Sequence, residues 1–235
     1  MSFPPLRFVK NNLTVDCYVC AKCGSSTLED WYEKLPGLDF KENNIHYKFL
    51  VIRNPFMRLY SFYSDKIVKR NFVKRTGNLL YGNESSRFNT TGDIIEGCSF
   101  RELVNRMFQE DKRGNRFEAH LESQVDHIGL TKEFIDSMDL VVRLEDFSEG
   151  MTEVCSSTGI PPDSILRKLV GASNKVEGTF NNVSDLKRED FLKLGGVPKD
   201  YKLFYDDDLV NKVSQMYSSD LSLLNYTFDG VNNAT

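Results

Sequence analysis

Residues 46–61 read H-Y-K-F-L-V-I-R-N-P-F-M-R-L-Y-S, and this stretch decides the fold class. Residues 46–53 form a nearly continuous apolar run of the kind that is buried inside a parallel sheet. Asn54 then suits a helix N-cap and Pro55 a first helical residue, which predicts a helix to about Lys69. Its apolar residues repeat at i, i+3, i+4 and i+7 and define a core face: Phe56, Leu59, Tyr60, Tyr63 and Ile67.

Strand and helix patterns also alternate elsewhere in the chain. Residues 14–20 are β-branched and aromatic, end in a Gly-Ser-Ser turn, and precede a helical pattern over residues 27–34. Residues 139–144 predict a third core strand, and residues 145–158 a helix that ends before a glycine and two prolines. This alternation predicts one α/β domain over residues 1–235, with a central parallel sheet and helices on both faces.

Three further segments complete the expected organisation. Residues 99–109 and 205–224 each predict a helix, the second being the terminal one. Residues 71–97 are rich in Gly, Asn, Ser and Thr and predict a long surface loop.

Composition excludes several classes of protein. The 235 residues are 40% hydrophobic and 27% charged, as in an ordinary soluble globular protein, which excludes disorder, collagen and coiled coil. The net charge of −4 lacks the basic excess that a nucleic-acid partner requires. Apolar runs such as residues 49–52 are far shorter than the roughly 20 residues that span a bilayer, and residues 1–10 do not resemble a secretory signal.

Cysteines and glycosylation sequons point to different compartments. The five cysteines are odd in number, and Cys17, Cys20 and Cys23 lack a fourth zinc ligand, so we expect reduced thiols, no metal and a cytoplasmic location. Six N-x-S/T sequons exceed the roughly two that composition predicts, which keeps a Golgi-lumenal enzyme without its anchor as the alternative. The sequons begin at Asn12, Asn83, Asn89, Asn182, Asn225 and Asn233.

The first strand-to-helix junction predicts a phosphate cradle. Residues 20–27 read C-A-K-C-G-S-S-T, which places a lysine, a glycine and three hydroxyls at a helix N-terminus, where backbone N–H groups and the helix dipole attract anions. Lys22 precedes Gly24, the reverse of the order in nucleoside-triphosphate loops, which counts against ATP or GTP hydrolysis. The plainer alternative is a capped helix start with a solvated lysine.

The second junction predicts a second phosphate site. Arg53 stands at the carboxyl end of a strand, where ligands bind in open α/β sheets. Helical spacing places Arg58, Ser61 and Asp65 together, away from the apolar face. The arginine fork and the serine hydroxyl suit a phosphate, and the alternative is a solvated face on which Arg58 pairs with Asp65.

Together the two junctions resemble the sulfotransferases that use 3′-phosphoadenosine 5′-phosphosulfate (PAPS), especially the Golgi-type carbohydrate branch and its bacterial relatives. In that family a P-K-x-G-[ST]-[ST] loop binds the 5′-phosphosulfate and an R-[DN]-P-x-x-R-x-x-S segment binds the 3′-phosphate. The second pattern is matched here by Arg53, Asn54, Pro55, Arg58 and Ser61.

Weaker similarities extend over most of the chain. Residues 119–124 resemble the family's H-[WF]-x-P-Q block, residues 141–147 its strand ending in L-E, and residues 217–228 its C-terminal signature. Residues 181–184 occupy the place of an N-x-S segment near the nucleotide. The departures are Ala21 for the loop proline, and Leu121 and Ser123 within the His block.

The resemblance implies a P-loop-like domain that binds PAPS and releases adenosine 3′,5′-bisphosphate. Lys22 would stabilise the bridging oxygen, and no metal is required for the transfer. The implied donor-binding residues are Lys22, Cys23, Gly24, Ser25, Ser26, Thr27, Arg53, Ser61, Asn182 and Ser184.

The general base is assigned among few candidates. His120 is favoured because it lies in the block that resembles the acceptor side, with Glu122, His127 and Glu145 as alternatives. His46 begins a strand and suits a structural or surface role.

The predicted activity is sulfuryl transfer from PAPS to a hydroxyl or amine of a carbohydrate or small metabolite. The alternatives are an atypical P-loop nucleotide kinase and a non-catalytic nucleotide- or glycan-binding module.

Overall fold

The computed structural model describes residues 4–35, 45–71, 97–114, 117, 119–161 and 175–232. Its internal contacts divide the chain into two compact units, each made from two segments of the sequence. The sheet unit consists of Met1–Arg53 and Ser123–Gly171, and the helical unit of Asn54–Glu122 and Ala172–Thr235. The expectation that the whole chain behaves as one domain stays a prediction.

The sheet unit is built on four strands in the order β1-β2-β3-β4. The pairs β2–β3 and β3–β4 are parallel, as predicted, and the β3 residues 49–52 are all essentially buried. The three parallel strands fall within a residue or two of the predicted ranges. The strands are β1 (Leu6–Lys10), β2 (Leu13–Val19), β3 (His46–Ile52) and β4 (Leu140–Arg143).

Strand β1 makes the sheet mixed, which corrects the prediction of a parallel sheet. It pairs antiparallel with β2 through a tight turn at Asn11 and Asn12, both of which have positive φ. Asparagine tolerates this left-handed conformation better than most residues, which favours such a hairpin turn. Only Phe8 of the strand is buried, so this short edge strand has little of the apolar pattern from which strands are predicted.

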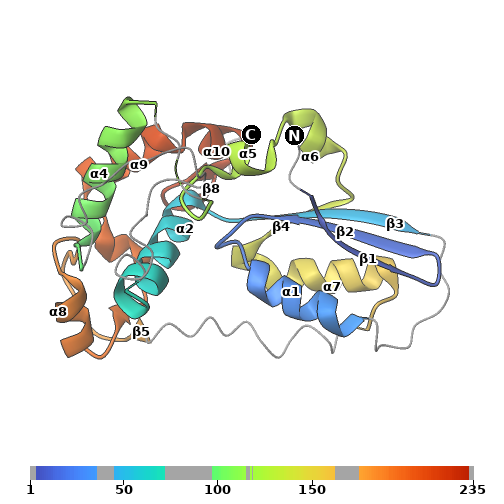
Figure 1. Ribbon diagram of the computed structural model, residues 1–235, viewed down its shortest axis with the longest axis horizontal. Helices are drawn as coiled ribbons and strands as arrows, with labels where there is room; N and C mark the ends of the chain where they lie inside the picture. Colours follow the sequence, from blue (N-terminus) through green and yellow to red (C-terminus); the bar gives the residue numbers. More distant parts are fainter. Residues whose placement is uncertain are drawn as a thin grey trace. The chain divides into compact units, whose positions relative to one another are not determined.

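Helices α1 (Ser25–Lys34) and α7 (Phe147–Thr158) lie against the same face of the sheet (Figure 1). Trp31 of α1 packs edge-on against Phe49 of β3. Gly150 lets α7 approach β4 closely, because a Cβ there would lie 2.5 Å from a Val142 methyl group. Side chains alternate across a strand, so Tyr18, next to the inward-facing Cys17, points to the opposite face and contacts Phe134 of α6 (Lys132–Asp136).

The helical unit begins with the helix that the sequence predicted after Asn54. The Asn54 side chain accepts a hydrogen bond from the Phe56 N–H, and Pro55 is the first residue of α2 (Pro55–Phe62). The helix continues as a wider π-helical segment, η2 (Tyr63–Lys69), so that it ends at the predicted residue. All five residues of the predicted core face are buried.

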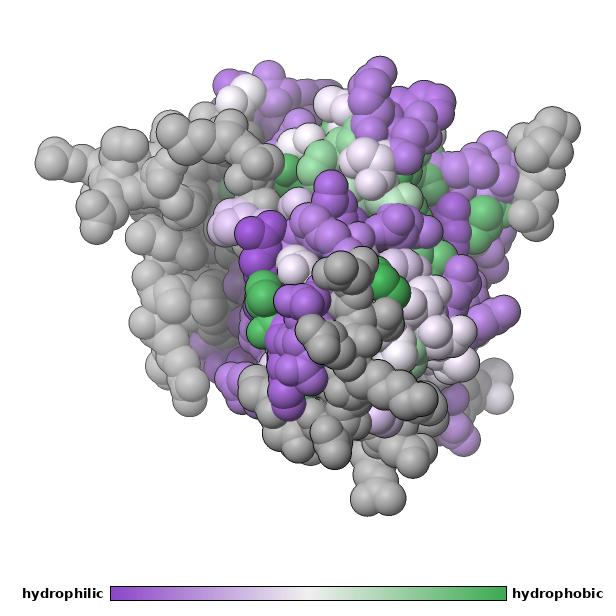
Figure 2. All heavy atoms as spheres, turned by 90° about the vertical axis from the view of Figure 1, so that its right-hand side faces the viewer, coloured by the Kyte–Doolittle hydropathy of each residue, from purple (hydrophilic) through white to green (hydrophobic). Residues whose placement is uncertain are grey.

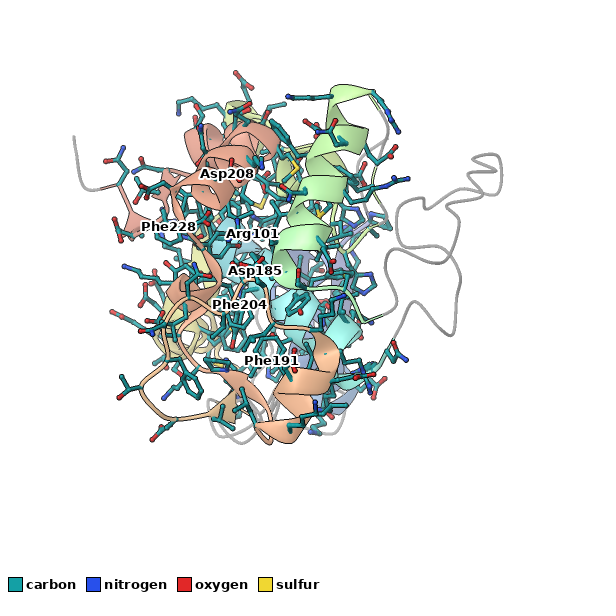
Figure 3. The ribbon with its side chains drawn as sticks, turned by 90° about the vertical axis from the view of Figure 1, so that its left-hand side faces the viewer. Arg101, Asp185, Phe191, Phe204, Asp208 and Phe228 are labelled. Carbon is teal, nitrogen blue, oxygen red and sulfur yellow. The ribbon has the colours of Figure 1, made fainter. Side chains whose placement is uncertain are left out.

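The other elements of the helical unit surround an aromatic core. Phe204 contacts Phe191 in a stacked pair at 5.6 Å and Phe100 edge-on at 5.5 Å, and Figure 3 shows Phe191 and Phe204 in the same cluster. These elements are α4 (Phe100–Lys112), β5 (Lys175–Val176), α8 (Arg188–Lys193), β6 (Val197–Pro198), η6 (Tyr201–Phe204), α9 (Asp207–Met216), α10 (Ser218–Leu223), β7 (Tyr226–Thr227) and β8 (Gly230–Val231).

The single terminal helix predicted over residues 205–224 is wrong in one respect. It is divided into α9 and α10 at Tyr217, whose φ of −110° and ψ of 28° are not helical. The buried Tyr217 hydroxyl donates to the Leu121 carbonyl oxygen at 2.6 Å. This contact is remote in sequence, and helical periodicity carries no sign of it.

Among the described residues on the face drawn in Figure 2, hydrophilic ones predominate and the hydrophobic ones form small separate patches. Within the described part of the chain, no helix is both long and apolar enough to cross a membrane. The loop expected over residues 71–97 lies almost entirely outside the described residues.

Candidate functional site

The predicted phosphate cradle is a turn between β2 and α1 in the sheet unit. Lys22 and Gly24 both have positive φ, 68° and 90°, so the chain reverses direction through two left-handed residues. Gly24 is the N-cap of α1 and supplies no side-chain cap to the first-turn N–H groups. A helix start without a side-chain cap presents N–H groups to an anion, which fits the predicted 5′-phosphosulfate site.

The side chains of this turn divide between interior and surface. Cys23 is wholly buried, and its thiol donates to Gln124 Oε1 at 3.1 Å and lies 3.2 Å from the Cys20 sulfur. Lys22, Ser25 and Thr27 are half-buried, and Ser26 is exposed. The predicted lysine and hydroxyls therefore remain accessible, whereas the Cys23 side chain faces the interior.

Arg53 joins the second predicted phosphate motif to the first. Its guanidinium Nη1 donates to the Lys22 carbonyl oxygen at 2.9 Å. Its main-chain N–H and C=O are both bonded to the Gln124 amide, at 2.9 and 2.8 Å. The structure thus brings a cationic fork to the Lys22 turn, within the sheet unit alone.

Arg58 corrects the predicted solvent face of the following helix. Its side chain is buried, with Nη1 donating to the Glu122 carbonyl oxygen at 2.7 Å and Nη2 to that of Ala119 at 3.2 Å. Asp65, the partner considered for Arg58, instead pairs with Arg70 at 2.9 Å. The helical wheel was wrong for Arg58 because this arginine stabilises a distant turn of the chain. Ser61 is half-buried on α2, in the helical unit.

The turn of residues 119–122 carries the favoured base candidate. Arg58 and Tyr217 together donate to three of its carbonyl oxygens, those of Ala119, Leu121 and Glu122. His120 is half-buried in this turn, with its ring 6.2 Å from that of Phe62.

The other base candidates are divided between the two units: His127 and Glu145 lie in the sheet unit and Glu122 in the helical unit. His127 is half-buried on α5 (Gln124–Ile128), and Glu145 is exposed in η4 (Leu144–Asp146). Glu122 is half-buried beside His120 in the chain. His46 pairs with the buried Asp16 at 2.8 Å, in keeping with the structural role expected of it.

The predicted Asn182 and Ser184 form a small network in the helical unit. The buried Ser184 donates to Asn182 Oδ1 from its hydroxyl at 2.6 Å and from its N–H at 2.9 Å. Arg101 donates to the Ser184 hydroxyl at 2.8 Å and also binds Asp206. It binds Asp185 as well, and Figure 3 labels both residues. The hydrogen bond from Arg101 keeps the pKa of Asp206 below its ordinary value. Ser184 and Arg101 therefore orient Asn182, which is exposed.

Two of the buried thiols are weaker acids than an exposed cysteine. Burial raises the pKa of Cys98 to about 12 and that of Cys155 to about 11, so these thiols stay protonated near neutral pH. Across the described residues, no three His, Cys, Asp or Glu side chains are grouped so that they could hold a metal ion.

The sequence did not predict that three residues would organise distant segments of the chain. Gln124 was noted only as the end of the His block, Arg58 only as a phosphate candidate, and Tyr217 only as part of the C-terminal signature. Each acts on the backbone of a segment far away in the chain, which local pattern does not reveal.

One comparison identifies the chain's relationship to known proteins. The family described as the Sulfotransferase family matches residues 21–227, which is most of the chain and includes every predicted site residue. No match was found among curated proteins or among solved structures.

Proposed function

Because the chain belongs to the sulfotransferase family and is a PAPS-dependent enzyme, we propose that it sulfates a hydroxyl or amine of a carbohydrate or small metabolite. Members of this family use PAPS as the sulfuryl donor. The proposed acceptor class rests on the resemblance of the two strand-to-helix junctions, taken together, to the carbohydrate branch of the family.

We assign the donor's 5′ side to the Lys22–Thr27 turn and its 3′-phosphate to Arg53 and Ser61. The donor set fits the group: an ammonium, a guanidinium, hydroxyls and the uncapped N–H groups of α1 all suit anionic oxygens. Bound PAPS supplies an activated sulfuryl group whose leaving group is a phosphate. Asn182, held by Ser184, completes the proposed nucleotide contacts.

Lys22 would stabilise the negative charge that grows on the 5′-phosphate oxygen as the bond to sulfur breaks. A fixed positive charge acts most strongly on charge that develops in the transition state. We assign the removal of the acceptor proton to His120, because histidine is the side chain that most often serves as a general base. The hydrogen bonds from Arg58 and Tyr217 to this turn support the role, because a base must be held in place to be effective.

The observation that carries the donor assignment is the hydrogen bond from Arg53 to the Lys22 carbonyl, which joins two separately predicted phosphate motifs. We expect adenosine 3′,5′-bisphosphate to raise the melting temperature well above the value with ATP and magnesium at equal concentration. An equal or larger shift with ATP would contradict the assignment and favour a kinase. A screen of acceptors with radiolabelled PAPS then identifies the acceptor class.

We also propose a cytoplasmic location, on the basis of an odd number of cysteines, all five of which are buried and outside any disulfide. Asn12 and Asn225 begin sequons at exposed turns, so they serve as reporters of the lumenal alternative. Protein isolated from its natural source should have its unmodified mass. A mass decrease after enzymatic removal of N-glycans would refute the proposal.

A further inference from the structure

Gln124 is a wholly buried polar side chain to which no role has been assigned. It is the first residue of α5, and its amide forms three hydrogen bonds within the sheet unit. Oε1 accepts from the Arg53 N–H at 2.9 Å and from the Cys23 thiol at 3.1 Å, and Nε2 donates to the Arg53 carbonyl at 2.8 Å. The orientation of the amide is fixed, because the backbone N–H of Arg53 only donates and its carbonyl only accepts.

This pairing has a specific effect on Arg53. A single side-chain amide satisfies both main-chain groups of the residue, as a neighbouring strand would, directly after β3 ends at Ile52. The backbone of Arg53 is thereby held where its guanidinium reaches the Lys22 carbonyl. The thiol of Cys23 connects the same amide to the turn itself.

We propose that Gln124 is a positioning residue that fixes Arg53, next to the Lys22–Cys23 turn, in the arrangement that recognises the donor's 3′-phosphate. The proposal rests on the donor assignment made above. Gln124 is wholly buried and does not itself touch the nucleotide. It acts through the backbone of Arg53, so its loss should weaken recognition of the 3′-phosphate more than recognition of the rest of the nucleotide.

The isosteric variant Gln124→Glu allows the role to be switched by pH. An ionised carboxylate cannot donate to the Arg53 carbonyl and would repel it, whereas a protonated carboxyl restores one donor and one acceptor at the same positions. Burial favours the protonated form and raises the pKa of the introduced carboxyl. Gln124→Met has a similar volume but leaves the Arg53 N–H and C=O without this partner.

The test is calorimetric binding of adenosine 3′,5′-bisphosphate and of adenosine 5′-monophosphate, which lacks the 3′-phosphate, to the full chain. The quantity compared is the preference for the bisphosphate, which is the affinity for adenosine 3′,5′-bisphosphate divided by that for adenosine 5′-monophosphate. The preference of each variant is expressed as a ratio to that of the wild type at the same pH. We expect this ratio to fall about tenfold or more in Gln124→Met, and in Gln124→Glu at pH 8, as expected for leaving buried polar groups unpaired. In Gln124→Glu it should recover as the pH is lowered to 6. Gln215→Glu, at an exposed position of α9, is the matched control and should stay at the wild-type ratio.

The outcomes separate the two proposals. If the wild type prefers the bisphosphate and both Gln124 variants keep that preference, the positioning role is wrong while the donor assignment stands. The role is also wrong if the variants melt earlier and lose both nucleotides equally. A wild type with no preference refutes the assignment of Arg53, and the positioning role with it. If Gln124→Met does not fold, Gln124→Glu at pH 6 and pH 8 still decides the question.

Discussion

The Lys22–Thr27 turn of the sheet unit and the 119–122 turn of the helical unit are both stabilised by side chains that bind carbonyl oxygens. They differ in what forms the turn itself. The first turn is largely local, because Lys22 and Gly24 adopt left-handed conformations and α1 begins immediately afterwards. The second depends on Arg58 and Tyr217, 61 to 96 residues away in sequence. A turn that is formed by its own residues has a recognisable motif in the sequence. A turn that is stabilised by distant side chains has almost none.

The largest expected effect tests whether the 119–122 turn is catalytic at all. His120→Ala should lower the single-turnover rate of sulfation by about 10² to 10⁴, the usual contribution of a general base. Calorimetric affinity for adenosine 3′,5′-bisphosphate should stay nearly unchanged. His127→Ala, on α5, is the comparison variant and should keep most of the activity.

Two results at His120 would contradict this picture in different ways. Near-normal turnover in His120→Ala would move the base role to Glu122 or His127. Loss of bisphosphate binding would instead place His120 among the donor contacts.

The next effect tests the Lys22–Thr27 turn. Lys22→Ala should lower the rate of the chemical step by about 10² to 10³, which is the scale of losing one well-placed electrostatic group. Bisphosphate binding should suffer less than turnover, because the proposed charge is greatest in the transition state. The control is Lys34→Ala, in the last turn of α1, the helix that follows the Lys22–Thr27 turn. It removes an exposed lysine that pairs with Asp30, and it should leave the rate and the bisphosphate affinity unchanged. Equal losses of binding and rate would show that Lys22 acts only in binding.

The third effect tests whether distant side chains stabilise the 119–122 turn. Arg58→Met removes two hydrogen bonds and leaves the carbonyls of Ala119 and Glu122 without them, which should cost about 2 to 3 kcal/mol in urea unfolding. Tyr217→Phe removes one hydrogen bond and should cost about 1 kcal/mol. Both should lower turnover more than bisphosphate affinity. Wild-type stability in Arg58→Met would mean that the turn is stable without Arg58.

The parts of the fold that the sequence predicted are those formed by local residues, and the parts that it missed depend on distant contacts. Asn54 and Pro55 act within one helical turn, and the buried run over residues 49–52 lies in a central strand, so both were predictable. Strand β1 was missed because an exposed edge strand needs little apolar patterning. The burial of Arg58 and the helix break at Tyr217 were missed because both serve a turn elsewhere in the chain.

The candidate site also contains residues predicted from sequence motifs and a residue whose role only the structure indicates. Lys22 and Arg53 were predicted from motifs at strand-to-helix junctions, where backbone geometry restricts the choice of residues, and their roles stay predictions. Gln124 binds the backbone of Arg53, 71 residues away, and only the three-dimensional contacts indicate its role.

The smallest expected effect separates the stability of the sheet unit from that of the 119–122 turn. Asp16 is buried between Arg7 of β1, at 2.6 Å, and His46 of β3, at 2.8 Å. Burial alone would raise the pKa of Asp16, but hydrogen bonds and charge from Arg7 and His46 outweigh it and lower the pKa below the usual 3.8. The folded state therefore binds the proton less readily than the unfolded state does. The resulting stabilisation is present above about pH 4 and is lost as the pH falls through the lower folded value.

Asp16→Asn should therefore lower the free energy of unfolding at pH 7 by only about 1 kcal/mol, because Arg7 and His46 are both about half exposed and solvent screens their charges. The measurement is urea unfolding at intervals from pH 7 to pH 3, and the difference between variant and wild type should shrink below pH 4. Asp136→Asn, which removes an exposed partner of Lys132 on α6, should change stability by less than about 0.5 kcal/mol at every pH. Parallel curves for Asp16→Asn and wild type would show that the Asp16 carboxylate contributes nothing through its ionisation.

Because Asp16 lies in the sheet unit, Asp16→Asn should leave the destabilisation caused by Tyr217→Phe unchanged. The double variant should then lose as much free energy of unfolding as the two single variants lose together. A double variant whose loss equals that sum would establish that the two sites are independent.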